Sequence, residues 1–222
     1  MSGITFKLGL LTAVLLASCA DDPAAPLERS VAPTTRSTSV PALPPVEIAI
    51  RLERRTSDEA TVRFEDVVRA TLTDARGWQQ AGFRLSFAHD APFVVVLAEA
   101  ADVDTLCEPY DTFGLYSCQI GPVVALNADR WRTATPEWTG DVDTYRQMFV
   151  NHEVGHLLGQ HHPAVQCPAP GEAAPVMAQQ STELDGCLPN PWPLAWEIAC
   201  AARHAEPLAP PYEPSSTSTC GP

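Results

Sequence analysis

Lysine is nearly absent from this chain of 222 residues, in which Lys7 stands beside thirteen arginines. Acidic residues outnumber basic ones, and the formal net charge is -13. The sequence therefore contains no recognisable basic patch, which excludes nucleic acid as the expected partner, and its acidity favours solubility. The chain also has no Cys-x-x-Cys pair, which argues against a zinc site built from cysteines.

The first residues have the pattern of an export signal. Lys7 gives a positive start, Leu8 to Ala17 is apolar but too short to be assigned as a transmembrane helix, and Leu16-Ala17-Ser18-Cys19 matches a lipobox. In that pattern Cys19 becomes the lipidated first residue of the mature protein. The alternative is an ordinary cleaved signal peptide and a secreted protein. We therefore predict an exported protein of the bacterial cell envelope, anchored to the membrane through a lipid on Cys19.

Composition divides the chain into four parts. Residues 1–18 form the signal peptide, and residues 19–44 are rich in Pro, Ser and Thr. Such a segment buries too little apolar surface to offset its ordering entropy, so we predict a disordered tether. One folded domain is expected at 45–205 and a tail at 206–222.

Hydrophobic periodicity within the domain predicts a sheet accompanied by helices. Alternating or continuous apolar residues predict strands, at 46–53, 83–87, 93–98, about 115–120 and 123–127. Apolar residues at helical spacing predict helices, from Phe64 to near Asp74–Gly77, from near Asp141 through the motif described below, and at 193–204. This order favours an α+β fold with a twisted mixed sheet and backing helices.

Seven cysteines leave six if Cys19 is lipidated. An even number in an oxidising compartment indicates three disulfides, for which fifteen pairings are possible. Pairing nearest neighbours is the simplest arrangement, which would join Cys107 with Cys118, Cys167 with Cys187, and Cys200 with Cys220.

The most informative stretch is 151–162, N-H-E-V-G-H-L-L-G-Q-H-H. His152 and His156 lie one helical turn apart, so they project from one face and can bind one metal ion beside Glu153. Gly159 can end the helix in a left-handed conformation, after which the chain returns to deliver His162 as the third ligand. The adjacent His161 is an alternative third ligand, although the spacing favours His162.

This residue set suits catalytic zinc. Three neutral imidazoles leave one position of Zn²⁺ open for water, whose pKa falls to about 7. Glu153 is placed to act as the general base. The competing interpretations, an adventitious metal site or a purely structural zinc, require neither Glu153 nor Gly159.

The motif resembles that of the metzincin clan of zinc endopeptidases, in which three histidines bind zinc and the glutamate is the base. The clan also has a Met-turn beneath the metal, for which Met177 is the matching residue here. Some members place a tyrosine two residues after this methionine, but this chain has Gln179. The resemblance implies a metzincin-like fold with an active-site helix and a loop-rich C-terminal subdomain, which holds the Met-turn and a final helix.

A closer similarity is to an actinobacterial family of exported proteins, known mainly as a domain of unknown function with a metzincin-type signature. It rests on several stretches besides the motif: D-A-R-G-W, L-C-E-P-Y-D-T-F-G-L-Y-S-C, V-A-L-N-A-D-R-W, A-P-V-M-A-Q-Q and L-P-N-P-W-P. The similarity covers 46–193 and implies a zinc metallopeptidase of unsettled substrate. It also implies the pairs Cys107 with Cys118 and Cys167 with Cys187, while Cys200 and Cys220 lie outside it.

We therefore expect a monomeric zinc endopeptidase that acts on a peptide or protein. An edge strand of the sheet would bind an extended substrate by strand addition, with 123–127 expected near that edge. The alternatives are a catalytically silent, zinc-stabilised envelope binding module and a zinc amidase acting on a non-peptide envelope component.

Overall fold

The structure, a computed structural model, describes residues 44–203. The expected signal peptide, Cys19, all of the tether but its last residue, and the tail with Cys220 lie outside the described residues. Within 44–203, no helix has the length and apolar character needed to cross a membrane.

A five-stranded mixed sheet forms the centre of the domain, with the strand order β2-β1-β3-β5-β4. Four strands are parallel: β1 (Val46–Arg54), β2 (Phe83–Phe87), β3 (Phe93–Ala98) and β5 (Val123–Asn127). The short strand β4 (Cys118–Ile120) pairs antiparallel with β5 and forms one edge of the sheet. The mixed sheet predicted from the sequence is confirmed, and all five strands lie within or close to the predicted ranges.

Strand β3 shows why the apolar patterns were informative. All six of its residues are buried, because both faces of this central strand are covered. Val95 and Leu97 point into the larger core, while Val94 and Val96 point into a smaller one on the other face. A continuous apolar run is the pattern that such a strand requires.

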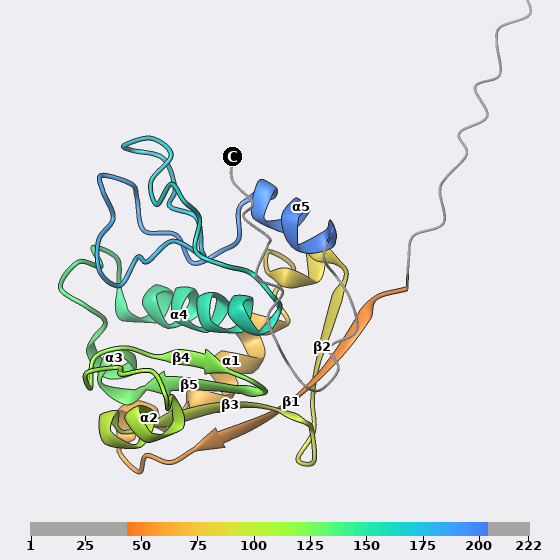
Figure 1. Ribbon diagram of the computed structural model, residues 1–222, viewed down its shortest axis with the longest axis vertical. Helices are drawn as coiled ribbons and strands as arrows, with labels where there is room; N and C mark the ends of the chain where they lie inside the picture. Colours follow the sequence, from red (N-terminus) through yellow and green to blue (C-terminus); the bar gives the residue numbers. More distant parts are fainter. Residues whose placement is uncertain (1–43, 204–222) are drawn as a thin grey trace, which may run out of the picture. The chain divides into compact units, whose positions relative to one another are not determined.

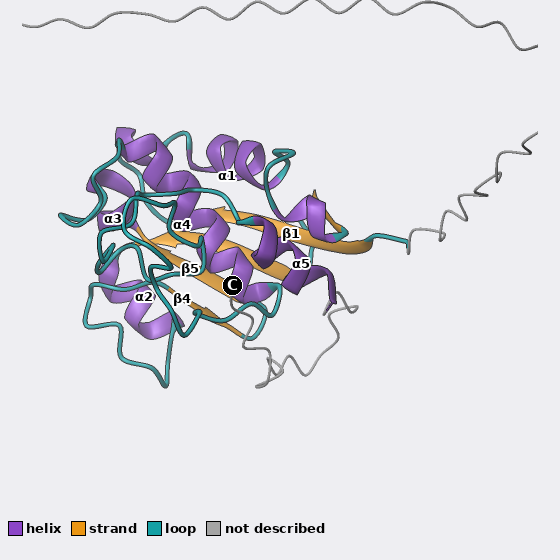
Figure 2. Ribbon diagram, turned by 90° about the horizontal axis from the view of Figure 1, so that it is seen from above, coloured by secondary structure: helices purple, strands orange, loops and turns teal. Residues whose placement is uncertain are grey.

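Helices cover the two faces unequally (Figure 2). The larger core packs against side chains of α1 (Phe64–Leu72) and α4 (Val142–Leu157). The smaller core packs against α2 (Ala100–Leu106). Figure 1 shows α4 running beside β4 and β5, at the sheet edge opposite β2. The chain also forms α3 (Ala128–Thr133), α5 (Ala195–Arg203) and two short 3-10 turns, 59–61 and 78–81.

The predicted start of the motif helix is confirmed. The Asp141 side chain accepts a hydrogen bond from the Thr144 backbone N–H at 2.7 Å and so caps α4. The sequence did not predict α2 and α3, which are short. Asn127 caps α3, because its side chain accepts a hydrogen bond from the Asp129 backbone N–H. A single capping residue before a six-residue helix is too short a sequence pattern to predict that helix.

The predicted strand at about 115–120 is shorter in the structure, where only Cys118–Ile120 pairs with β5. Leu115 and Tyr116 instead lie in the loop that the Cys107–Cys118 disulfide closes. The Cys167–Cys187 disulfide is also present, which confirms two of the three expected pairs. Cys200 lies buried in α5, and its expected partner Cys220 is outside the described residues.

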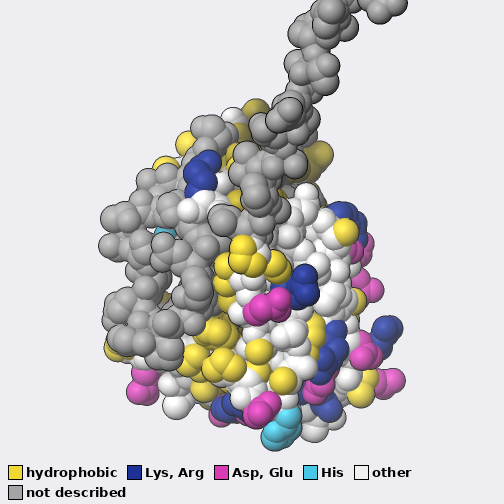
Figure 3. All heavy atoms as spheres, turned by 90° about the vertical axis from the view of Figure 1, so that its right-hand side faces the viewer, with side chains coloured by type: hydrophobic (Ala, Val, Ile, Leu, Met, Phe, Trp, Pro, Cys, Tyr) yellow, Lys and Arg dark blue, Asp and Glu magenta, His cyan; other side chains and the backbone are white. Residues whose placement is uncertain are grey.

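On the face drawn in Figure 3, acidic and basic side chains lie next to each other over much of the right-hand side, and no large area carries one sign of charge. Ion pairs such as Arg51 with Glu53 and Arg84 with Glu47 have the same mixed character. This agrees with the absence of a basic patch in the sequence.

Core packing around β3 generates a stability prediction. Leu97→Ala should lower the free energy of unfolding by about 2–5 kcal/mol, because Leu97 is fully buried and its removal leaves a cavity. Val62→Ala should change it by less than about 0.5 kcal/mol, since Val62 is exposed. Urea unfolding with the disulfides intact measures both. Equal losses in the two variants would contradict this placement of the core.

Candidate metal centre

Helix α4 carries the first two histidines on the stripe that faces the core. Tyr145 and Phe149 on this stripe are buried, and His152 and His156 continue it one and two turns further on. The helix ends at Leu157, and Gly159 has a φ of 79°, as expected for a residue that reverses the chain. The turn that delivers His162 is therefore the one predicted from the motif.

The three histidines converge through their Nε2 atoms. His162 Nε2 lies 3.2 Å from His152 Nε2 and 3.1 Å from His156 Nε2. Four-coordinate zinc, with bonds of about 2.0–2.1 Å, places two nitrogen ligands about 3.3–3.4 Å apart. The three rings therefore lie close to the spacing that one zinc ion needs. His161 is not part of this cluster.

Backbone carbonyls fix which nitrogen faces the centre. His152 Nδ1 lies 2.8 Å from the Val176 carbonyl oxygen, and His156 Nδ1 lies 2.8 Å from the Gln160 carbonyl oxygen. A carbonyl can only accept, so each Nδ1 carries the proton and each Nε2 presents a lone pair. His162 could donate a single Nε2 proton to only one of these two lone pairs. A cation satisfies all three nitrogens, and the outer hydrogen bonds are those typical of metal-binding histidines.

The electrostatic surroundings keep these rings neutral. Burial, followed by the charge of His162, lowers the pKa of His152 to about 4. Burial also lowers the pKa of His156 well below its ordinary value and, with His161, lowers that of His162. Neutral imidazole is the form that binds a metal ion. The cluster is therefore ready to bind at neutral pH without first losing protons.

Glu153 is buried, with 8% of its surface exposed, and lines the same cavity as the three histidines. Among residues 44–203, no side chain or backbone group donates a hydrogen bond to its carboxylate. Burial alone raises the pKa of Glu153 to about 8. A divalent cation bound by the neighbouring nitrogens would oppose this effect and favour the ionised carboxylate.

Gly155 explains how the segment around Met177 reaches the site. A Cβ at Gly155 would overlap the Met177 sulfur and lie 2.9 Å from Trp78 Cζ2. The absence of a side chain thus lets Met177 pack directly against α4. The preceding Val176 then offers its carbonyl to His152. The sequence pointed to Met177 only through the clan resemblance, and the structure places it against Gly155 of α4.

Glu197 is a second buried acid that the sequence reasoning missed. Its carboxylate accepts hydrogen bonds from the backbone N–H groups of Val176 at 3.0 Å and Met177 at 2.9 Å. It also accepts from the Leu194 N–H at 2.7 Å, at the start of α5. Burial raises the pKa of Glu197 to about 7, although the three hydrogen bonds favour the charged form. The sequence feature that could have indicated Glu197 is a single acidic residue within the otherwise apolar run A-W-E-I-A-C-A-A.

The centre opens into a cleft of about 540 Å³. Helix α4 forms its floor. One wall comes from the 107–118 loop and the start of β4, and the other from residues 179–182. Tyr145 on the floor lies 2.9 Å from the Ser181 hydroxyl on the second wall. Arg130 is the only arginine or lysine among the described lining residues, and the motif gave no indication of it.

The structure therefore brings together the predicted ligands His152, His156 and His162 with the predicted base Glu153. The Cys167–Cys187 disulfide closes the loop that contains Met177.

Residues 45–193 match a family described as a protein of unknown function, DUF3152. The match covers more than half of the chain, which therefore belongs to this family. No curated protein matches the chain.

The choice between the two adjacent histidines can be tested directly. His162→Ala should weaken zinc binding by more than about 100-fold, because it removes a ligand, and loss of an outer hydrogen-bond partner alone costs 10–100-fold. His161→Ala is the matched control and should retain one zinc per chain, since His161 is outside the cluster. Competition with a chromophoric chelator measures affinity. Equal weakening in both variants would reject His162 as the specific third ligand.

Packing at Gly155 generates a second prediction. Gly155→Ala should lower the free energy of unfolding by about 1–3 kcal/mol through overpacking against Met177 and Trp78. The better helix propensity of alanine, worth about 1 kcal/mol, offsets only part of this loss. Adding Met177→Ala makes room for the new Cβ, so the double variant should be more stable than additivity predicts. Strict additivity in urea unfolding would show that the two residues do not interact.

Proposed function

We propose that this member of the DUF3152 family is an exported, zinc-dependent endopeptidase of metzincin-like fold. One observation carries the proposal: three histidine Nε2 atoms, two of them in rings whose tautomer is fixed by a backbone carbonyl, converge in an open cleft beside a carboxylate that has no hydrogen-bond partner among residues 44–203. A closed structural zinc site would have four protein ligands, whereas three protein ligands with one open position are typical of catalytic zinc.

The chemistry divides between the metal and Glu153. Zinc, when bound by His152, His156 and His162, supplies a Lewis acid and lowers the pKa of a water to about 7. Glu153 follows His152 directly in the chain and lines the same cavity. Its carboxylate takes a proton from the attacking water and then passes that proton to the leaving amine. Because no donor among residues 44–203 occupies this carboxylate, both oxygens are available to accept.

The edge strand β4 suits a peptide substrate. Among the described residues it pairs only with β5, and Ser117, Cys118 and Gln119 line the cleft. An extended peptide can add to such an edge through backbone hydrogen bonds. Strand β5 lies next to the edge, as expected from the sequence, but β4 forms the edge itself. Met177 supports the site from beneath, in the role of a Met-turn.

Export agrees with the two disulfides, which persist in oxidising compartments outside the cytosol. We further propose that Cys19 carries a lipid anchor and that the domain acts as a monomer. Mass measurement of the mature N-terminus tests the anchor, because lipidation adds the mass of acyl chains to Cys19.

Activity measured on the zinc-loaded full chain tests the mechanism. Glu153→Gln should reduce cleavage of a mixed protein substrate by about 10²–10⁴-fold, since it removes the general base while preserving size. Zinc content should stay at one per chain. Glu172→Gln is the control, because Glu172 is exposed and does not line the cleft, and it should cleave like the wild type.

The other outcomes identify the alternatives. Retention of both zinc and activity in Glu153→Gln would reject Glu153 as the base. A wild type that binds one zinc but cleaves no protein would favour a zinc-stabilised binding module. Products that contain a hydrolysed non-peptide amide, detected by mass spectrometry, would favour an envelope amidase. A chelator should abolish cleavage by the wild type, and added zinc should restore it.

A further inference from the structure

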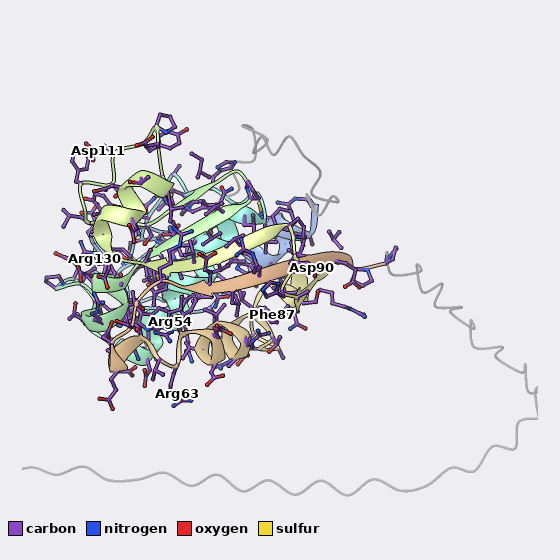
Figure 4. The ribbon with its side chains drawn as sticks, turned by 90° about the horizontal axis from the view of Figure 1, so that it is seen from below. Arg54, Arg63, Phe87, Asp90, Asp111 and Arg130 are labelled. Atoms are coloured by element: carbon purple, nitrogen blue, oxygen red, sulfur yellow. A yellow bond between two sulfur atoms is a disulfide. The ribbon has the colours of Figure 1, made fainter. Side chains whose placement is uncertain are left out.

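The loop closed by the Cys107–Cys118 disulfide, residues 107–118, carries an unusual concentration of exposed apolar surface. Of seven large hydrophobic side chains exposed among residues 44–203, four belong to this loop. Their exposed fractions are 67% for Tyr110, 70% for Phe113, 49% for Leu115 and 44% for Tyr116. Figure 4 shows the loop around Asp111 projecting from the body of the domain, on the side where Arg130 lies.

This exposure is fixed by the structure of the loop. Besides the disulfide at its ends, Asp104 accepts hydrogen bonds from the Thr112 hydroxyl and the Gly114 N–H. On the other side, Asn127 Nδ2 donates to the Gly114 carbonyl at 3.1 Å, and Arg130 Nε donates to the Leu115 carbonyl at 2.8 Å. The loop therefore holds its apolar side chains in place before any ligand binds, which lowers the entropy lost on binding.

Three of the four side chains face the cleft. Tyr110, Leu115 and Tyr116 line the cavity that contains His152, His156 and Glu153, whereas Phe113 does not line it. The apolar wall also leads directly into β4, which begins at Cys118. The same wall thus offers apolar side chains followed by the open backbone edge of a strand.

We propose that the 107–118 loop is the specificity wall of the cleft and selects extended peptides that carry a large aliphatic or aromatic side chain. The inference rests on the proposed endopeptidase function and names its substrate class. A peptide backbone pairs with β4 while its large apolar side chain packs against Leu115 and Tyr116, with Tyr110 at the rim. The opposite wall at 179–182, Q-Q-S-T, is polar, so the preference is set on one side of the bound peptide.

Exposed aromatic residues can also bind a lipid membrane, but the geometry of this loop favours a peptide. Insertion into a membrane would use the most exposed side chain, Phe113, and would not require the cleft. The three residues that line the cleft instead lie next to the three histidines and a strand edge, which together match an extended chain with one apolar side chain.

The test profiles cleavage sites in a mixture of peptides with randomised sequence, using the zinc-loaded full chain and mass spectrometry. The wild type should cut at a fixed position relative to Leu, Ile, Met, Phe, Tyr or Trp in the peptide. Leu115→Ala and Tyr116→Ala should each lower kcat/KM for these peptides by about 10-fold, mainly through KM, because one apolar contact in a pocket contributes a factor of this order. They should leave zinc content unchanged.

Phe113→Ala is the matched control from the same loop. It removes an aromatic ring that is more exposed than Tyr116 but does not line the cleft, so its cleavage profile and KM should equal those of the wild type. A wild type with no preference for apolar residues would overturn the proposal. So would a Phe113→Ala variant that loses the preference as fully as Tyr116→Ala does.

A binding measurement separates this inference from the proposed function. The measurement needs no turnover and therefore uses the Glu153→Gln variant. This variant is titrated with a fluorescent peptide that contains Leu and Phe, and with a peptide of equal length that contains Ser and Asn. Tighter binding of the apolar peptide, lost on adding Tyr116→Ala, supports the specificity wall even if the wild type cleaves nothing. Equal binding of both peptides would overturn the specificity wall without contradicting the proposed endopeptidase function.

Vesicles of phosphatidylethanolamine and phosphatidylglycerol test the competing occupant, with Cys19→Ser in the full chain so that no lipid is attached. Absence of co-sedimentation supports the peptide-binding role. Co-sedimentation that Phe113→Ala abolishes would identify the loop as a membrane-binding surface and overturn the proposal.

Discussion

The close contact between Gly155 of α4 and the turn at Val176–Met177 is the constraint on which the candidate site depends. Any side chain at Gly155 would occupy the space that the Met177 sulfur and Trp78 now fill. Because the turn lies so close to the helix, the Val176 carbonyl reaches His152 Nδ1 and fixes the ring. Glycine costs about 1 kcal/mol relative to alanine within a helix, and here it allows the packing that orients a candidate metal ligand.

This contact is held from both sides by segments far apart in the sequence. Trp78 donates its indole N–H to the Asn151 carbonyl at 2.9 Å, which fixes the residue just before His152. Glu197 binds the N–H groups of Val176 and Met177 and joins the turn to α5. The Cys167–Cys187 disulfide then closes the loop in which the turn lies. A region with little regular structure is therefore joined to α4 and α5 by specific contacts.

The parts of the site that the sequence predicted are those set by local geometry. Helical spacing places His152 and His156 on one face, and the left-handed conformation of Gly159 returns the chain to His162. A short sequence motif is therefore enough to predict that the three histidines converge. Strands were predicted where burial imposes a period of two or a continuous apolar run. Glu197 and Arg130 were missed because each contacts a residue far away in the sequence, Met177 at 20 residues and Leu115 at 15, and such pairings leave no periodic signal. Leu115 and Tyr116 were assigned to a strand because their apolar character suits one, although here it faces the cleft.

The two buried acids show how the surroundings divide structural from chemical roles. Glu197 receives three backbone hydrogen bonds, so its charge is satisfied by the fold and its oxygens are fully used. Glu153 is buried to a similar extent but receives none from residues 44–203. A cation near such a carboxylate favours its ionised form and opposes the effect of burial on its pKa. The histidine cluster beside it is the part of the described chain suited to hold such a cation. A fold that leaves Glu153 without a partner among residues 44–203 keeps this carboxylate open to the cleft, as its proposed role of general base requires.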